Sequence, residues 1–153
     1  MTATSETTLC RSRQHALKCL ALTLTKLDDA CIEIPTHTEQ HHLSECLQCV
    51  SCRNKLVKGV FGFIDGTCHK SGKCEDDNKH RKYYNGYYGI HGWKAVYLVS
   101  ADGTIAWAKL AYAPAHDNTV FAELQAILED KCTDGYKILG NSMFQWCHVC
   151  VHP

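Results

Sequence analysis

Asp65 is the residue whose type and position most directly suggest chemistry. It lies in the stretch 62–67 (GFIDGT), and the run 57–64 before it is apolar and β-branched apart from one lysine and two glycines. This pattern predicts a buried strand that ends at Asp65, with Gly66 turning the backbone and Thr67 holding the turn. A carboxylate at the end of a buried strand is costly unless it is paired, hydrogen-bonded or bound to metal. We therefore expect a functional role for Asp65, with a structural Asx turn as the alternative.

A basic stretch follows this acidic residue. Residues 53–82 hold eight basic and four acidic side chains, although the whole chain has no net charge. The part from 68 to 82 lacks apolar periodicity and predicts a solvated loop, and the run 83–88 (YYNGYY) predicts a turn. Basic side chains bind phosphates and tyrosines stack on bases, so this stretch can contact nucleic acid; the alternative is a solvated loop with tyrosines covering the sheet. The candidate contacts are Lys70, Lys73, Lys79, Arg81, Lys82 and Tyr84.

The cysteines form a third group with possible chemistry. The candidate zinc ligands are Cys46, Cys49 and Cys52, which repeat a two-residue spacing, and Cys147 and Cys150, with His152 nearby. Cysteine pairs at this spacing are typical of structural zinc sites. The alternative is that Cys49 and Cys52 are small buried hydrophobic residues on a helix.

Length and composition set the class of protein. A chain of 153 residues that is 45% hydrophobic and 21% charged has material for one domain with an ordinary core. Its 11 cysteines are odd in number, and no secretion signal is recognisable, which favours a reducing intracellular setting with free thiols. The apolar run 17–25 is too short to span a bilayer and precedes no cleavage pattern, so no membrane contact is expected.

Apolar spacing predicts the elements that position these groups. Steps of three and four residues predict a helix from Leu9 to about Cys31, then a polar linker at 36–42 and a second short helix at 43–58. Alternating residues predict strands at 91–100 and 104–111, joined by a hairpin turn at 101–103. His91 is interpreted as a strand-end histidine and not as a ligand.

A helix and a last strand complete the pattern. Asp117 or Asn118 is a suitable N-cap for a helix at 119–130, and a strand is predicted at 136–139 before Gly140 and Asn141. The stretch 145–153 fits no element. The order strand, hairpin pair, helix, strand indicates an α/β fold in which a crossover helix serves a mixed sheet.

Six motifs in this order resemble the catalytic domain of Harbinger-type DDE transposases, a transposase-derived endonuclease family with an RNase H-like core. They are residues 62–67 (GFIDGT), 84–86 (YNG), 91–94 (HGWK), 100–105 (SADGTI), 116–119 (HDNT) and 138–142 (ILGNS). The resemblance implies an incomplete RNase H-like α/β domain at residues 55–144. A helical N-terminal segment and linker at 1–54 would precede it, and an irregular tail at 145–153 would follow.

The resemblance also implies roles for individual residues. Asp65 matches the first catalytic aspartate, and Asp117 matches an accessory aspartate at the start of the helix, for which a helix N-cap is the alternative. Asn141 stands where the family has its second catalytic aspartate, with a turn residue as the alternative. The third acid, a glutamate, is expected well beyond Asn141, yet only 12 residues follow and none is acidic.

These departures bear on the reaction. Two-metal phosphoryl transfer needs several carboxylates that converge on a pair of Mg²⁺ or Mn²⁺ ions, and Asn141 removes one negative charge. We therefore expect a truncated DDE-type endonuclease by descent, catalytically inactive, with weak divalent-metal affinity at Asp65 and Asp117. DNA, a separate DNA-binding protein and a nuclear or cytoplasmic location are implied as well. The alternative class is a non-catalytic DNA- or protein-binding module stabilised by zinc at the cysteine clusters.

Overall fold

The chain consists of two compact units, residues 1–32 and 33–153. The computed structural model describes residues 6–27, 31–50, 57–72, 77–132, 135–144 and 147–152, with the side chains of 6–10, 77 and 79 left out. The first unit contains helix α1 (Glu6–Leu24), which confirms the predicted N-terminal helix but ends earlier than expected. No helix in the described ranges is long and apolar enough to cross a membrane.

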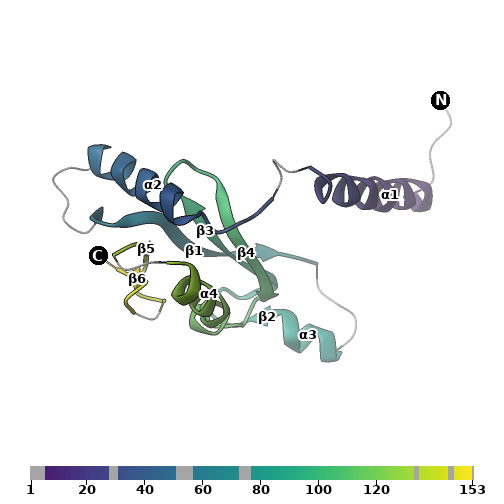
Figure 1. Ribbon diagram of the computed structural model, residues 1–153. Coiled ribbons are helices and arrows are strands. Elements are labelled where there is room, and N and C mark those ends of the chain that lie inside the picture. The colour runs from purple at the N-terminus through teal and green to yellow at the C-terminus, as the bar shows by residue number, and fades with distance from the viewer. Residues whose placement is uncertain are drawn as a thin grey trace. The chain divides into compact units, whose positions relative to one another are not determined.

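The second unit is built on a mixed six-stranded sheet (Figure 1). Its strands are β1 (Val60–Lys70), β2 (Tyr84–Asn85), β3 (Ile90–Ser100), β4 (Ile105–Tyr112), β5 (Lys137–Gly140) and β6 (Cys150–Val151). The strand order is β2, β3, β1, β5, β6, and β4 also pairs with β3. β1, β3 and β4 are antiparallel, whereas β1, β5 and β6 are parallel. This is the mixed α/β sheet expected of an RNase H-like domain.

The described residues of this unit also form three helices, α2 (His37–Val50), α3 (Asp77–Tyr83) and α4 (Asp117–Lys131). α4 is the crossover connection between β4 and β5, and its apolar side chains at 120, 121, 124 and 128 are buried. They join a core with Val96 and Leu98 of β3, Ile138 of β5 and Phe144. α2 packs against β1, and its buried Gln40 donates a 3.2 Å hydrogen bond to the last carbonyl of α4, that of Lys131.

Most of the predicted elements at 91–140 are confirmed. β3, β4, α4 and β5 all lie within two residues of their expected bounds. The turn between β3 and β4 has Gly103 at φ +92°, a conformation that glycine adopts without strain. These elements are correct because alternation, turn residues and helical spacing agree with the long-range packing there.

The predicted end of the first strand is wrong. β1 continues through Asp65 and Gly66 to Lys70 instead of turning at Gly66. The reason is its antiparallel partner β3, which pairs Asp65 with Tyr97 and Thr67 with Ala95. Pairing with β3 overrides the local turn preference of the Gly-Thr dipeptide, because β5 pairs with β1 only as far as Ile64.

Four further expectations are corrected. The polar run 36–42 is not a linker, because α2 begins at His37. The predicted loop at 68–82 contains the end of β1 and helix α3. The N-cap of α4 is His116, so Asp117 and Asn118 are helical residues and not caps. The final stretch contributes β6, whose Cys150 and Val151 pair with β5.

Candidate functional site

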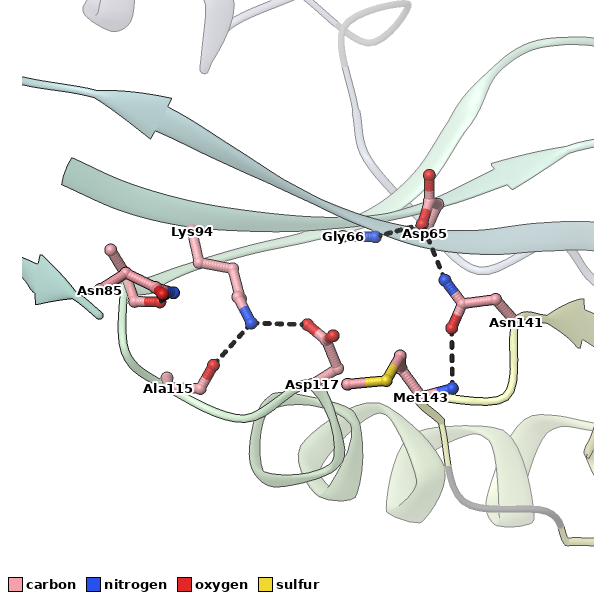
Figure 2. A network of polar contacts seen from close by, with 9 residues as sticks. Asp65, Gly66, Asn85, Lys94, Ala115, Asp117, Asn141 and Met143 are labelled. Carbon is pink, nitrogen blue, oxygen red and sulfur yellow. Dashed lines mark hydrogen bonds and ion pairs between the residues drawn. The ribbon is translucent and has the colours of Figure 1, made fainter. Parts of the chain in front are cut away.

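Asp65 and Asn141 meet across neighbouring parallel strands. The register of β1 and β5 brings the residue that follows β5 to the level of Asp65. Asn141 Nδ2 donates a 3.3 Å hydrogen bond to Asp65 Oδ1, and Asn141 Oδ1 accepts a 2.9 Å bond from the backbone N–H of Met143 (Figure 2). The backbone N–H of Gly66 donates to the same Asp65 oxygen at 2.8 Å. The carboxylate therefore faces two N–H donors.

Asp117 forms an ion pair with Lys94 at the start of α4. Lys94 Nζ lies 2.9 Å from Asp117 Oδ1, and the two side chains are only 10% and 14% exposed (Figure 2). Lys94 Nζ also donates a 2.6 Å hydrogen bond to the carbonyl of Ala115. A Cβ atom at Gly66 would lie 2.9 Å from Asp117 Oδ1, so glycine leaves the room that this carboxylate needs. The negative charge of Asp117 is thus compensated within the protein.

A cavity of about 500 Å³ opens beside this ion pair. Lys94, Asp117 and Asn141 line it together with Tyr87 and Tyr88 of the turn after β2.

Asn85 holds the turn that borders this cavity. Its Nδ2 donates a 2.6 Å hydrogen bond to the carbonyl of Ala113, and its Oδ1 accepts bonds of 3.0 and 3.2 Å from the N–H groups of Tyr87 and Tyr88. Asn85 is buried, and both the N–H₂ group and the oxygen of its side-chain amide are hydrogen-bonded. These bonds hold the cavity wall in a defined conformation.

Asp65 faces a different space. It lines a separate cavity of about 330 Å³ with Phe63 and Tyr97. Asn141 is therefore hydrogen-bonded to Asp65 and lines the same cavity as Asp117. The carboxylates of Asp65 and Asp117 line different cavities.

This donor set does not fit a two-metal centre. Among the described residues, no three side chains of histidine, cysteine, aspartate or glutamate lie close enough to hold one ion. Asp65 accepts a hydrogen bond from the amide N–H₂ of Asn141, and Asp117 is ion-paired with the ammonium group of Lys94. Hard divalent cations need converging oxygens with net negative charge, which this arrangement lacks.

The predicted nucleic-acid contacts lie on several elements. Lys70 is exposed at the end of β1, and Arg81 and Lys82 are exposed in the last turn of α3. Tyr84 of β2 is 43% exposed. Lys73 and the side chain of Lys79 lie outside the described residues.

The predicted zinc ligands are not assembled into a site in the described part of the chain. Cys46 and Cys49 are exposed on α2, and Cys52 lies outside the described residues. Cys147 and Cys150 exchange backbone hydrogen bonds of 3.0 and 3.3 Å. Burial, with a smaller contribution from Cys147, raises the pKa of Cys150 to about 12, so this thiol stays neutral at physiological pH.

Sequence reasoning missed the roles of Lys94 and Asn85. Lys94 interrupts the apolar, buried side of its strand. A buried lysine requires a charged partner, so this position was the signal in the sequence for an ion pair. Asn85 appears in the sequence only as a turn residue. Its bond to Ala113 depends on the register of β3 and β4 and has no local signal.

Comparison with known proteins identifies the class. The sequence model of the DDE superfamily endonuclease matches residues 64–153, which is more than half of the chain. The chain therefore belongs to the DDE superfamily endonuclease family, and it is related by descent to transposase-derived nucleases. Neither the curated proteins nor the solved structures that were compared gave a match.

Proposed function

We propose that this chain is a DNA-binding protein descended from a DDE nuclease that does not cleave DNA. The observation that carries the proposal is the hydrogen bond from Asn141 Nδ2 to Asp65 Oδ1. Where two catalytic carboxylates would share a metal ion, the chain has one carboxylate and one amide donor directed at it.

The electrostatics of the second acidic position support the same proposal. Two divalent ions carry four positive charges, and carboxylates both coordinate and neutralise them. Lys94 adds a positive charge next to Asp117, which opposes the approach of a cation. Activation of water by metal ions therefore lacks its ligands here.

Retained binding to DNA is supported by family membership and by exposed charge. Arg81 and Lys82 lie together on one short helix, near the exposed ring of Tyr84. Such groups contact phosphates and stack on bases without needing the catalytic metals. A nuclear location follows if DNA is the partner, and a separate DNA-binding protein would supply sequence choice.

A cleavage assay tests the first half of the proposal. Supercoiled plasmid incubated with the protein and Mg²⁺ or Mn²⁺ is expected to stay uncut, while a control nuclease nicks it. Nicking that disappears in Asp65→Ala would show that the site is active and would overturn the proposal.

A binding assay tests the second half. Fluorescence anisotropy of a labelled duplex is expected to show binding that weakens with salt, and Arg81→Ala and Lys82→Ala should each lower the salt slope by about one. Lys131→Ala, which removes an exposed charge from the end of α4, is the matched control and should leave the slope unchanged. Absence of DNA binding, combined with one zinc ion per chain that is lost in Cys147→Ser/Cys150→Ser, would favour the module stabilised by zinc at its cysteines instead.

A further inference from the structure

His80 and His91 converge on one point from two elements. His80 belongs to α3 and His91 to β3, yet their Nε2 atoms are 3.0 Å apart and their ring centroids 4.0 Å apart. Both side chains are half-buried. We propose that these two imidazoles form a binding site for a divalent transition-metal ion.

Aromatic contacts fix the geometry of this pair. Tyr84 places its ring 4.9 Å from that of His91 and stacks parallel to His80 at 6.3 Å. Tyr83, three positions after His80, packs against Trp93 and Tyr112 with centroids 4.7 and 5.1 Å apart. A spacing of three residues places His80 and Tyr83 on one side of the helix, so α3 is anchored to the sheet by both side chains. A bound ion would therefore cost little conformational entropy, because the two imidazoles are already held in place.

The separation of the two nitrogens matches a metal's coordination shell. Imidazole nitrogens bind zinc at about 2.0–2.1 Å, so two of them are about 2.9 Å apart at a right angle and about 3.4 Å apart in a tetrahedron. The observed 3.0 Å lies in this interval. Without metal, the same contact requires one nitrogen to carry a proton and the other to accept it, and an ion that binds both lone pairs replaces this shared proton.

The ligand type selects the class of ion. Imidazole suits Zn²⁺, Ni²⁺ and Cu²⁺, whereas Mg²⁺ and Ca²⁺ prefer oxygen. His80 and His91 supply two of the ligands that such an ion needs. A bound ion would clamp α3, and with it Arg81 and Lys82, onto the start of β3.

The test follows individual imidazoles, because the chain also has 11 cysteines and thiolates are zinc ligands too. The full chain, labelled with ¹⁵N and free of any histidine tag, is titrated with Zn²⁺ while the ring nitrogens are observed by long-range ¹H–¹⁵N spectra. One equivalent is expected to move the Nε2 signals of His80 and His91 together. In His80→Gln the signal of His91 should need at least ten times more Zn²⁺ to move.

Controls separate this site from the other candidates. His69→Gln removes an exposed histidine of the adjacent strand, and Asp65→Ala removes the acidic position; both should leave the paired shift intact. Zn²⁺ that binds without moving these two signals, or a His91 response unchanged in His80→Gln, would overturn the proposal. The wild-type spectra decide the matter even if a variant does not fold. Failure to bind DNA would leave this result untouched.

Discussion

The side-chain amide of Asn141 is the group that contacts Asp65 in the candidate site. Asparagine and aspartate have the same shape, but the amide presents N–H₂ where the acid would present a second charged oxygen. In this chain the N–H₂ group satisfies Asp65, so the acid has a neutral partner in place of a cation. Asparagine at this position therefore lacks the negative charge that aspartate would offer a metal ion.

Lys94→Met should be strongly destabilising. It leaves the carboxylate of Asp117 nearly buried without its counter-ion, and losing one partner of such a pair costs roughly 3 kcal/mol. The free energy of unfolding is measured by urea denaturation, also for the double variant Lys94→Met/Asp117→Asn. The double variant should recover part of the loss because no unpaired charge remains.

Lys109→Met is the matched control for this prediction. Lys109 Nζ lies 2.7 Å from Glu123 Oε2, but the two side chains are 44% and 55% exposed. Exposed ion pairs contribute less than about 1 kcal/mol. If both lysine variants lose the same small amount, the Lys94–Asp117 pair has no special structural role.

At the scale of elements, helix α2 begins within a run of polar residues. Thr36 and Glu39 form one half of a capping box: the N–H and the hydroxyl of Thr36 both donate to Glu39 Oε2 at 2.7 Å. The two residues have the threonine-x-x-glutamate spacing of this motif. The sequence contains this spacing, but the absence of apolar residues from 36–42 favours a linker over a helix.

Thr36→Ala should lower the free energy of unfolding slightly, because it removes the hydrogen bond from the Thr36 hydroxyl to Glu39. Thermal and urea unfolding measure the change. Thr38→Ala, two residues further on at an exposed helical position, is the control and should be neutral or slightly stabilising. Equal effects at the two positions would mean that the cap contributes nothing.

The same cap predicts a dependence on pH. The hydrogen bonds from the side chain and then the backbone of Thr36 lower the pKa of Glu39. A lowered pKa in the folded state gives stability that is present above the ordinary glutamate pKa and lost as the pH falls through the folded-state value. The stability difference between wild type and Glu39→Gln should therefore shrink from pH 7 to pH 3. A constant difference over that range would contradict this assignment.

Residue patterns in the sequence predicted the elements correctly where local propensity agrees with long-range packing. They failed where long-range packing overrides local propensity. The hairpin of β3 and β4 and the crossover helix followed from alternation, an Asp-Gly turn and helical spacing. The continuation of β1 past Asp65 depends on β3, which is thirty residues away in sequence, and the short helix α3 depends on the contacts of Tyr83 with Trp93 and Tyr112. No local signal contains those partners.

At the scale of the whole molecule, the topology assembles the candidate site. Asp65 comes from β1, Lys94 from β3 and Asp117 from the start of α4, and Asn141 directly follows β5. The sequence identified three of these residues through the resemblance of ordered motifs. It did not reveal that Lys94 compensates Asp117 or that Asn141 donates to Asp65, because such contacts depend on strand order and register.

Titration with Mg²⁺ and Mn²⁺ by calorimetry tests the central claim most directly, namely that position 141 is a metal-ligand position that has lost its charge. Asn141→Asp should bind at least about tenfold more tightly than wild type, because two adjacent carboxylates attract a cation that one does not. Adding Asp65→Ala to that variant should abolish the gain. Asn118→Asp, which adds an exposed carboxylate at the residue after Asp117, is the control and should not produce the gain. If Asn141→Asp binds no more tightly than wild type, or if the gain survives the loss of Asp65, the two positions do not form a shared metal site and the account of a degenerate nuclease centre is wrong.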